Sequence, residues 1–393
     1  MAVQKPTKLP VWDANETNIA EPPSTNQSDG WQVDANGVPQ KPPFQYHNYM
    51  WNLQYKWIEY LDAEKANING DSFQTFKVAD AINDDEAVSK KQTILNITVD
   101  KVLTVGSGGD YFTINEALEE ASKAYPLYKQ GGYSVEIRLL AGFIMQEQVI
   151  VKGVDLGYIT ITGEDDETVI QRDTLTVSTA NEYDGTNRYG AFNAINATLP
   201  VIGQLFNMDS SGGSGERSGV YAVAGSKVNV LSGCGVKNAG QHGILAFKRS
   251  EAHIEGSIFS GAGHNGVYAH SNSIINAKSV DASNAGTYGI YAYDGSTINA
   301  KSVDASNAGT YGIYAYNQSS INADQATVTD AGSVSIVADS NSGVSALTSN
   351  CTSNGDFEYY VNKGSTINID SYKGDARTNI TVNEWGAKGS ITS

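Results

Sequence analysis

The carboxylates of Asp281 and Asp304 come closest, in type and spacing, to a catalytic pair in this 393-residue sequence. They occupy the same position in two successive copies of one repeat, so outward-pointing side chains would lie about 5 Å apart, near the separation used by retaining glycosidases. A catalytic acid and a nucleophile need different surroundings to hold different pKa values. Lys278 and Lys301 are duplicated beside the two aspartates. We therefore interpret the pair as copies of a structural element and assign no catalytic residue.

Aromatic side chains recur once per repeat at positions that are expected to point outward. They are Phe247, Tyr268, His270, Tyr291, Tyr293, Tyr314 and Tyr316. A strip of aromatic rings suits stacking against sugar rings, so these residues are candidates for contact with a glycan or another partner. The same residues also suit exposed strand positions, where they would stack on one another or form the seam between subunits. The sequence leaves both interpretations open.

A repeat of 23 residues creates these columns. The nineteen residues Ile275–Tyr293 recur unchanged as Ile298–Tyr316. Within each copy apolar residues alternate with a period of two, as in a strand, and glycine or asparagine marks the corners. Three short strands per repeat predict a mostly β protein, a parallel β-helix with coils of about 23 residues. The expected inward column is Val220, Ile244, Val267, Ile290, Ile313 and Ile336.

The segment before the repeats is expected to cover the open end of this β-helix. Thr113 and Glu116 form a capping box, and the residues from Ile114 to Ala121 have one apolar face at helical spacing. GGDYFTINEALEEA, followed by VEIRLLAG and YITITG, resembles the opening of pectin-lyase-fold β-helices, which are common in bacteriophage tailspikes and polysaccharide-active enzymes. The resemblance implies a right-handed parallel β-helix with an N-terminal cap helix. It implies no single activity, because this scaffold carries lyases, hydrolases and inert shafts.

The first 64 residues form a separate small module that holds seven of the nine prolines and four of the five tryptophans. Trp-Asp-Ala, Ile-x-x-Pro, Gly-Trp, Pro-Pro-x-Gln-Tyr-x-Asn and Trp-Ile-x-Tyr-Leu follow one another here. This order resembles the N-terminal virion-attachment segment of phage tail fibre and tailspike proteins. The resemblance implies contact with phage tail or baseplate proteins through Trp12, Trp31, Tyr46, Asn48, Trp51 and Trp57.

These features divide the chain into four parts. Residues 1–64 are the expected attachment module, 65–100 a linker or neck, 101–380 the parallel β-helix and 381–393 a C-terminal cap. Cys234 and Cys351 lie five coils apart, too far for a disulfide, so both thiols are expected to be free.

The composition narrows the classes of partner. Forty-three acidic against 26 basic residues give a formal charge of −17, which repels nucleic acids and anionic lipid surfaces. The sequence has no apolar run that could span a membrane, and its first residues lack the pattern of a signal peptide. We therefore expect no nucleic-acid partner, no membrane insertion and synthesis in a bacterial cytoplasm. The five histidines show no metal-ligand spacing, so neither a metal nor another cofactor is expected.

The two resemblances together imply a phage tail fibre or spike, located in the virion. It is expected to be a homotrimer that attaches by its N-terminus and contributes to recognition of the host surface. The alternative is a tailspike depolymerase, a glycoside hydrolase or lyase that cleaves bacterial surface polysaccharide. A pectate-lyase mechanism needs a basic group near clustered acids, and from residue 200 onward the only arginines are Arg217, Arg249 and Arg377. The residues therefore favour a structural protein.

Overall fold

The computed structural model describes residues 100–123, 134–179, 185–209, 217–355, 357–369, 380–382 and 390–392. They belong to one compact unit, Gln92–Ser393. The expected attachment module, residues 1–64, and all but the last residue of the expected linker lie outside the described residues.

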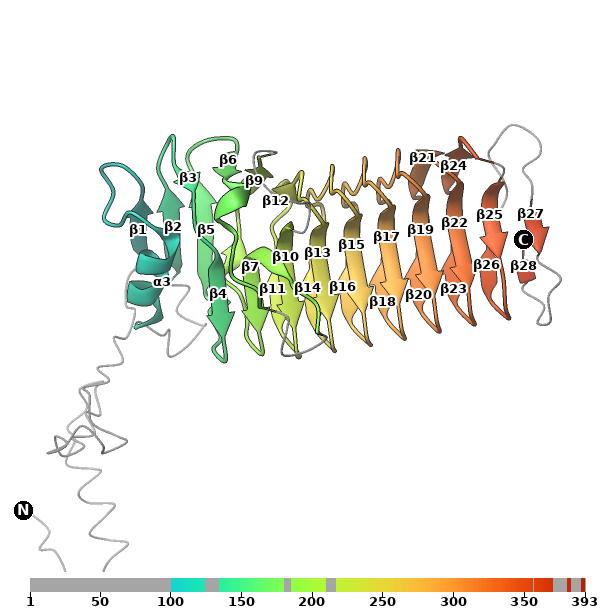
Figure 1. Cartoon of the computed structure of the whole chain (residues 1–393), viewed down its shortest axis with the longest axis horizontal. Helices are drawn as coiled ribbons and strands as arrows, with labels where there is room; N and C mark the ends of the chain where they lie inside the picture. The colour runs from blue at the N-terminus through green and yellow to red at the C-terminus, as the bar shows by residue number, and fades with distance from the viewer. Residues whose placement is uncertain are drawn as a thin grey trace, which may run out of the picture. The chain divides into compact units, whose positions relative to one another are not determined.

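The described residues form a right-handed parallel β-helix of about ten coils (Figure 1). Its largest sheet, face A, has ten parallel strands, each a coil apart. They are β4 (Val149–Lys152), β7 (Tyr189–Ile195), β10 (Arg217–Val223), β13 (His242–Phe247), β15 (Asn265–His270), β17 (Tyr288–Tyr293), β19 (Tyr311–Tyr316), β22 (Val334–Asp339), β25 (Phe357–Val361) and β27 (Ile380–Val382). The mostly β fold predicted from the repeat is thus confirmed.

Face B is an eight-stranded parallel sheet. Its strands are β11 (Lys227–Asn229), β14 (Glu251–His253), β16 (Ile274–Asn276), β18 (Thr297–Asn299), β20 (Ser320–Asn322), β23 (Gly343–Ser345), β26 (Thr366–Asn368) and β28 (Ser390–Thr392). Because β28 pairs with β26, strand pairing extends to Thr392, within the range expected to be a C-terminal cap. A four-stranded sheet belongs to the first coils and contains β1 (Lys101–Val105), β2 (Val135–Leu139), β5 (Ile159–Gly163) and β8 (Val201–Ile202).

The third side, face C, is paired less regularly than the sequence predicts. Strands occur only toward its two ends: β3 (Ile144–Met145), β6 (Thr168–Ile170), β9 (Leu205–Met208) and β12 (Gly235–Lys237), then β21 (Thr327–Ala331) and β24 (Asn350–Ser353). Between them Ile258, Asp281 and Asp304 form isolated bridges. The prediction of three strands in every coil is wrong there, because left-handed corners at Ser279 (φ 57°) and Asn284 (φ 58°) leave only four residues between them.

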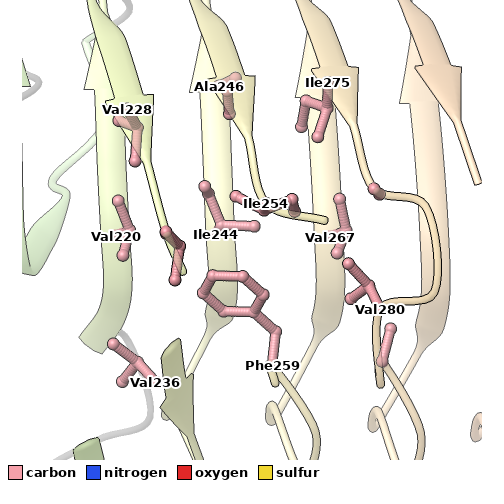
Figure 2. Close-up of a cluster of buried hydrophobic side chains, with 14 of the residues drawn as sticks. Val220, Val228, Val236, Ile244, Ala246, Ile254, Phe259, Val267, Ile275 and Val280 are labelled. Carbon is pink, nitrogen blue, oxygen red and sulfur yellow. The ribbon is translucent and has the colours of Figure 1, made fainter. Parts of the chain in front are cut away.

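The core is built from columns of one residue per coil, and Figure 2 shows side chains from all three faces meeting inside the rod. Ile244 comes from face A, Ile275 from face B and Phe259 from face C, and none of them is exposed. Burial of a side chain of this size stabilises the fold by about 1.5–3 kcal/mol. The predicted inward column is confirmed, because these residues are all 0% exposed: Val220, Ile244, Val267, Ile290, Ile313 and Ile336.

A glycine at the start of each middle strand of face A allows close contact with face C. A Cβ atom on Gly289 would lie 2.6 Å from Cβ of Ala305, which is closer than real Cβ atoms approach. Gly289 and Ile290 are therefore both turned toward the core, and the period-two alternation breaks at this point. Tyr288 and Tyr291, on either side of the two, both remain half-buried on the outer surface.

A ladder of buried serines fixes the corner between faces A and B. Ser273 Oγ donates to the carbonyl oxygen of His270 (2.8 Å) and accepts from the backbone N–H of Ser250 in the preceding coil (3.2 Å). One hydroxyl thus closes its own corner and joins two coils. The serines of this ladder are 3% exposed or less: Ser226, Ser250, Ser273, Ser296, Ser319, Ser342 and Ser365.

Helix α3 (Ile114–Ser122) precedes the first complete coils, as predicted. Thr113 and Glu116 form the capping box, and the apolar face of the helix is buried. The carboxylate of Glu147 accepts from the N–H groups of Ile114 (2.5 Å) and Asn115 (3.2 Å), so it binds the start of the helix. Burial raises the pKa of Glu147. This carboxylate has a structural role, since its bonds hold the helix against the rod.

We predict that Ser273→Ala lowers the free energy of unfolding by about 1–3 kcal/mol, because the buried N–H of Ser250 loses its acceptor. Denaturant titration measures the change. The control is Ser320→Ala at an exposed position of face B, which should change stability by less than about 0.5 kcal/mol. Equal effects of the two substitutions would contradict the assignment of the ladder as a stabilising element.

Candidate functional site

The outer surface of face A carries three aromatic columns, and they are densest on β17 and β19. We call Tyr288, Tyr291, Tyr293, Tyr311, Tyr314 and Tyr316 the tyrosine strip; each is half-buried. Strand register places each tyrosine of β17 beside its copy in β19. Toward the N-terminus the columns continue through Tyr268 and His270 of β15 and Phe247 of β13. The structure therefore brings together all seven predicted aromatic candidates.

The tyrosine rings stack on one another along the rod. The centroids of Tyr291 and Tyr314 lie 5.1 Å apart with an angle of 8° between the ring planes, and those of Tyr293 and Tyr316 lie 5.4 Å apart at 14°. Rings in this arrangement cover much of each other's faces. The strip consequently presents ring edges to a partner, and open ring faces occur only at the ends of the stacks.

Burial of one outward column falls from β10 to β19, and Val337 of β22, the next residue in the column, is again only 2% exposed. Tyr221 is 0% exposed, Leu245 2% and Tyr268 9%, although all three lie in an outward column. Tyr291 and Tyr314, further along the same column, are only half-buried. The outer face thus passes from a covered apolar cluster to an accessible strip.

Three phenol groups of the strip, those of Tyr288, Tyr291 and Tyr314, remain protonated at neutral pH. Burial raises the pKa of Tyr288, Tyr291 and Tyr314 above the ordinary tyrosine value. The negative charge of Asp339 further raises the pKa of Tyr314. These three phenol groups are uncharged, and their hydroxyls can both donate and accept hydrogen bonds.

Sequence reasoning missed Tyr288 and Tyr311, which form the third column with centroids 5.4 Å apart. Strict alternation assigns them to the core side, because they have the parity of Ile290 and Ile313. The signal that identifies them is the glycine that follows each tyrosine. Because this glycine packs against face C, the alternation of inward and outward residues shifts by one position. The side chain of the tyrosine before it therefore lies on the outer surface.

Asp281 and Asp304 are bridge partners on adjacent coils of face C. Asp281 Oδ1 accepts from the hydroxyl (2.6 Å) and the N–H (3.0 Å) of Ser283, and Asp304 Oδ1 accepts from the N–H of Ser306 (3.0 Å). Each carboxylate therefore closes a turn two residues further along its own coil. The two are local structural groups in similar surroundings, whereas acid and nucleophile roles require different ones.

A polar cluster lies where the Tyr288 column reaches the N-terminal half of face A. His242, Asn265 and Tyr288 occupy this register position on the successive strands β13, β15 and β17. His242 Nε2 lies 3.5 Å from a guanidinium nitrogen of Arg188. Burial, reinforced by the charge of Arg188, holds the pKa of His242 well below its usual range. His242 is therefore neutral at physiological pH.

The remaining predictions concern the attachment residues, the two cysteines, metal binding and membrane insertion. Trp12, Trp31, Tyr46, Asn48, Trp51 and Trp57 lie outside the described residues. Cys234 and Cys351 are free thiols. Among the described residues, no three His, Cys, Asp or Glu side chains gather in a way that could hold a metal ion. No helix in the described ranges is long and apolar enough to cross a membrane.

Comparison with known proteins supports the fold. The family model described as "Right handed beta helix region" matches residues 218–371, which run from β10 to just beyond β26. No curated protein matches the sequence. The stacked parallel sheets and the family match together define the chain as a parallel β-helix protein.

We predict that His242→Asn makes stability less dependent on pH; asparagine is the natural residue at this position one coil later. Below about pH 6.5 His242 binds a proton in the unfolded chain but not in the folded protein, where it is buried. Protonation therefore favours the unfolded state, and the free energy of unfolding decreases as the pH falls. Between pH 7.5 and 5.0 this group should remove about 2 kcal/mol from the free energy of unfolding. The control is His264→Asn, which replaces an exposed histidine. Its free energy of unfolding should decrease between pH 7.5 and 5.0 as much as that of the wild type. An unchanged pH dependence in His242→Asn would contradict the assignment.

Proposed function

We propose that the chain is a structural component of a bacteriophage tail fibre or spike, which attaches to the virion through residues 1–64 and contributes to host-surface recognition. The tyrosine strip is the observation that carries the recognition role. It is an accessible, uncharged aromatic surface on a chain of net charge −17, and contiguous surfaces of this kind mark interaction sites. The attachment role is supported by the resemblance of residues 1–64 to phage attachment segments.

The proposed partner of the strip is a bacterial surface polysaccharide. Ring edges and protonated phenols offer hydrogen bonds to hydroxyl groups, and the stack of like residues repeats at about 5 Å. A polymer of similar sugars can therefore meet the same groups in successive coils. Each contact is weak, but several made by one chain add up through their effective concentration.

We also propose that the protein is a homotrimer, as its resemblance to tailspikes implies. Three copies could bury the tyrosine strip as the seam between subunits, which gives the strip a second candidate role. The two roles differ in a measurable way, because substitutions in a seam change the mass of the particle whereas substitutions in a glycan-binding surface do not.

Depolymerase activity is the less favoured function. It would require Asp281 and Asp304, or another pair, to take unlike roles, and these two make similar hydrogen bonds to serines of duplicated sequence. A pair that stabilises turns already has a sufficient structural reason to be present.

The double variant Tyr291→Val, Tyr314→Val tests the strip. Valine occupies this register position in the following strand as Val337, so we expect the variant to fold. It should bind host cells or their purified polysaccharide at least about tenfold more weakly, because several contacts are lost together. Binding and the mass by light scattering are measured on the same sample. The expected mass is three times the 41.9 kDa of one chain, before and after substitution.

Ile274→Thr is the matched control, because it removes an exposed apolar side chain from face B and threonine follows there as Thr297. A variant that becomes monomeric would assign the strip to the seam and remove its recognition role. Undiminished binding by a trimeric variant would also refute recognition through the strip. Shortened polysaccharide chains after incubation with the wild type would favour the depolymerase.

Deletion of residues 1–64 tests attachment. Because the β-helix has its own core and its own cap helix, we expect the shortened chain to remain soluble and rich in β structure. It should be absent from phage particles assembled in its presence, as judged by immunoblotting of purified particles. Particles that contain the shortened chain at the wild-type level would disprove the attachment role.

A further inference from the structure

A hollow of about 530 Å³ opens on the corner between face C and face A, and none of its lining residues belongs to the tyrosine strip. Its walls come from segments far apart in sequence: Arg172 follows β6, Asn207 lies in β9 and Asp209 follows it, and Asn238 follows β12 (Figure 1). The volume falls within the range of small-molecule sites.

Two successive turns form one side of the hollow. Asn238 (φ 59°) and Gly261 (φ 71°) have left-handed backbone conformations in consecutive coils. Gly240 and Gly263 follow, and a Cβ atom on Gly263 would lie 2.3 Å from the carbonyl oxygen of Gly240. Because no side chain fits there, this part of the wall is bare backbone.

The polar side chains of the hollow are held by hydrogen bonds. Asn238 Nδ2 donates to Asn207 Oδ1 (2.8 Å), and Asn207 Nδ2 donates to Glu167 Oε2 (3.1 Å). Asp209 Oδ1 accepts from the N–H of Arg172 (2.9 Å). The amides are thus pre-oriented, an arrangement that lowers the entropic cost of binding. Arg172 and Asp209 carry opposite charges, so the hollow has no excess of either sign.

A second observation comes from the residues that follow these two turns. His242 and Asn265 are 4% and 5% exposed, and neither His242 Nδ1 nor Asn265 Oδ1 has a hydrogen-bond partner. Since Arg188 can only donate to Nε2, neutral His242 carries its proton on Nδ1. The two residues do not line the hollow; they begin β13 and β15 two residues after Gly240 and Gly263, where they are register partners, so adjacent coils hold one buried donor and one buried acceptor beside it. Buried polar atoms are nearly always paired in folded proteins, so these two call for a ligand group or water.

We propose that this corner is a binding site for a neutral, hydroxyl-rich oligosaccharide, with the amides of Asn207 and Asn238 as its principal hydrogen-bonding groups. Planar amides, bare peptide groups and a balanced charge suit sugar hydroxyls. An anionic glycan is disfavoured by Asp209 and by the net charge of −17. The inference rests on the proposed recognition of surface polysaccharide, and it places a specific site at a corner that no tyrosine of the strip lines.

Asn238→Gly is the test variant, because it removes the amide and keeps the left-handed corner, where glycine stands naturally one coil later as Gly261. The matched control is Asn284→Gly, at the equivalent corner (φ 58°) outside the hollow. The full-length proteins are applied to a printed array of neutral and acidic bacterial oligosaccharides, and affinities for the glycans that bind are then measured by calorimetry.

The wild type and Asn284→Gly should bind one or more neutral glycans, and Asn238→Gly should bind them about five- to tenfold more weakly, the usual effect of losing a hydrogen bond to a ligand. Equal binding by all three proteins would overturn the site, as would binding confined to acidic glycans or no binding to the neutral set. The variant Tyr291→Val, Tyr314→Val separates the two proposals. If it alone loses glycan binding, recognition through the strip stands and the corner site fails.

Discussion

In-register stacking is the constraint on which the rest of this structure depends. Each residue lies one strand spacing from its counterpart in the next coil, so a column persists only if its side chains tolerate their own copies. Apolar residues do so by packing, and amides do so by bonding, as when Asn299 Nδ2 donates to Asn276 Oδ1 (3.1 Å). Charged side chains are stabilised when the residue in the next coil carries the opposite charge, as when Lys278 pairs with Glu255 one coil earlier (2.6 Å).

The same constraint accounts for the tyrosine strip without any function. Tyrosines placed in register must stack, and stacking turns their faces toward one another. What stacking does not explain is the accessibility of the strip. Equivalent positions in the same column are covered, Tyr221 and Leu245 nearer the N-terminus and Val337 nearer the C-terminus, so the rod buries this column only in part. Accessibility on β17 and β19 is therefore the feature that points to a partner.

The sequence was sufficient to predict the features that follow from the repeat and from local motifs. An offset of 23 with a period of two placed Ile290 and Ala292 in the core, and the capping box at Thr113 placed the cap helix. Features that depend on distances between coils were not accessible in this way. The close approach of Gly289 to Ala305 moved Tyr288 outward, and the role of the serine ladder follows from bonds to a preceding coil, which the serine spacing by itself does not reveal.

Chemical specificity in a rod of this kind requires the columns to vary. Where the coils are identical, as in Ile275–Tyr293 and Ile298–Tyr316, every group is presented twice in the same surroundings, which suits repeated weak contacts but not unlike roles for two residues. The coils around β13 and β15 differ: histidine stands beside asparagine in register, and the turns before them carry asparagine and then glycine. Unlike groups at one-coil spacing can meet different atoms of one ligand. The proposed selective recognition therefore belongs to the varied coils, and the proposed repeated contact to the duplicated coils.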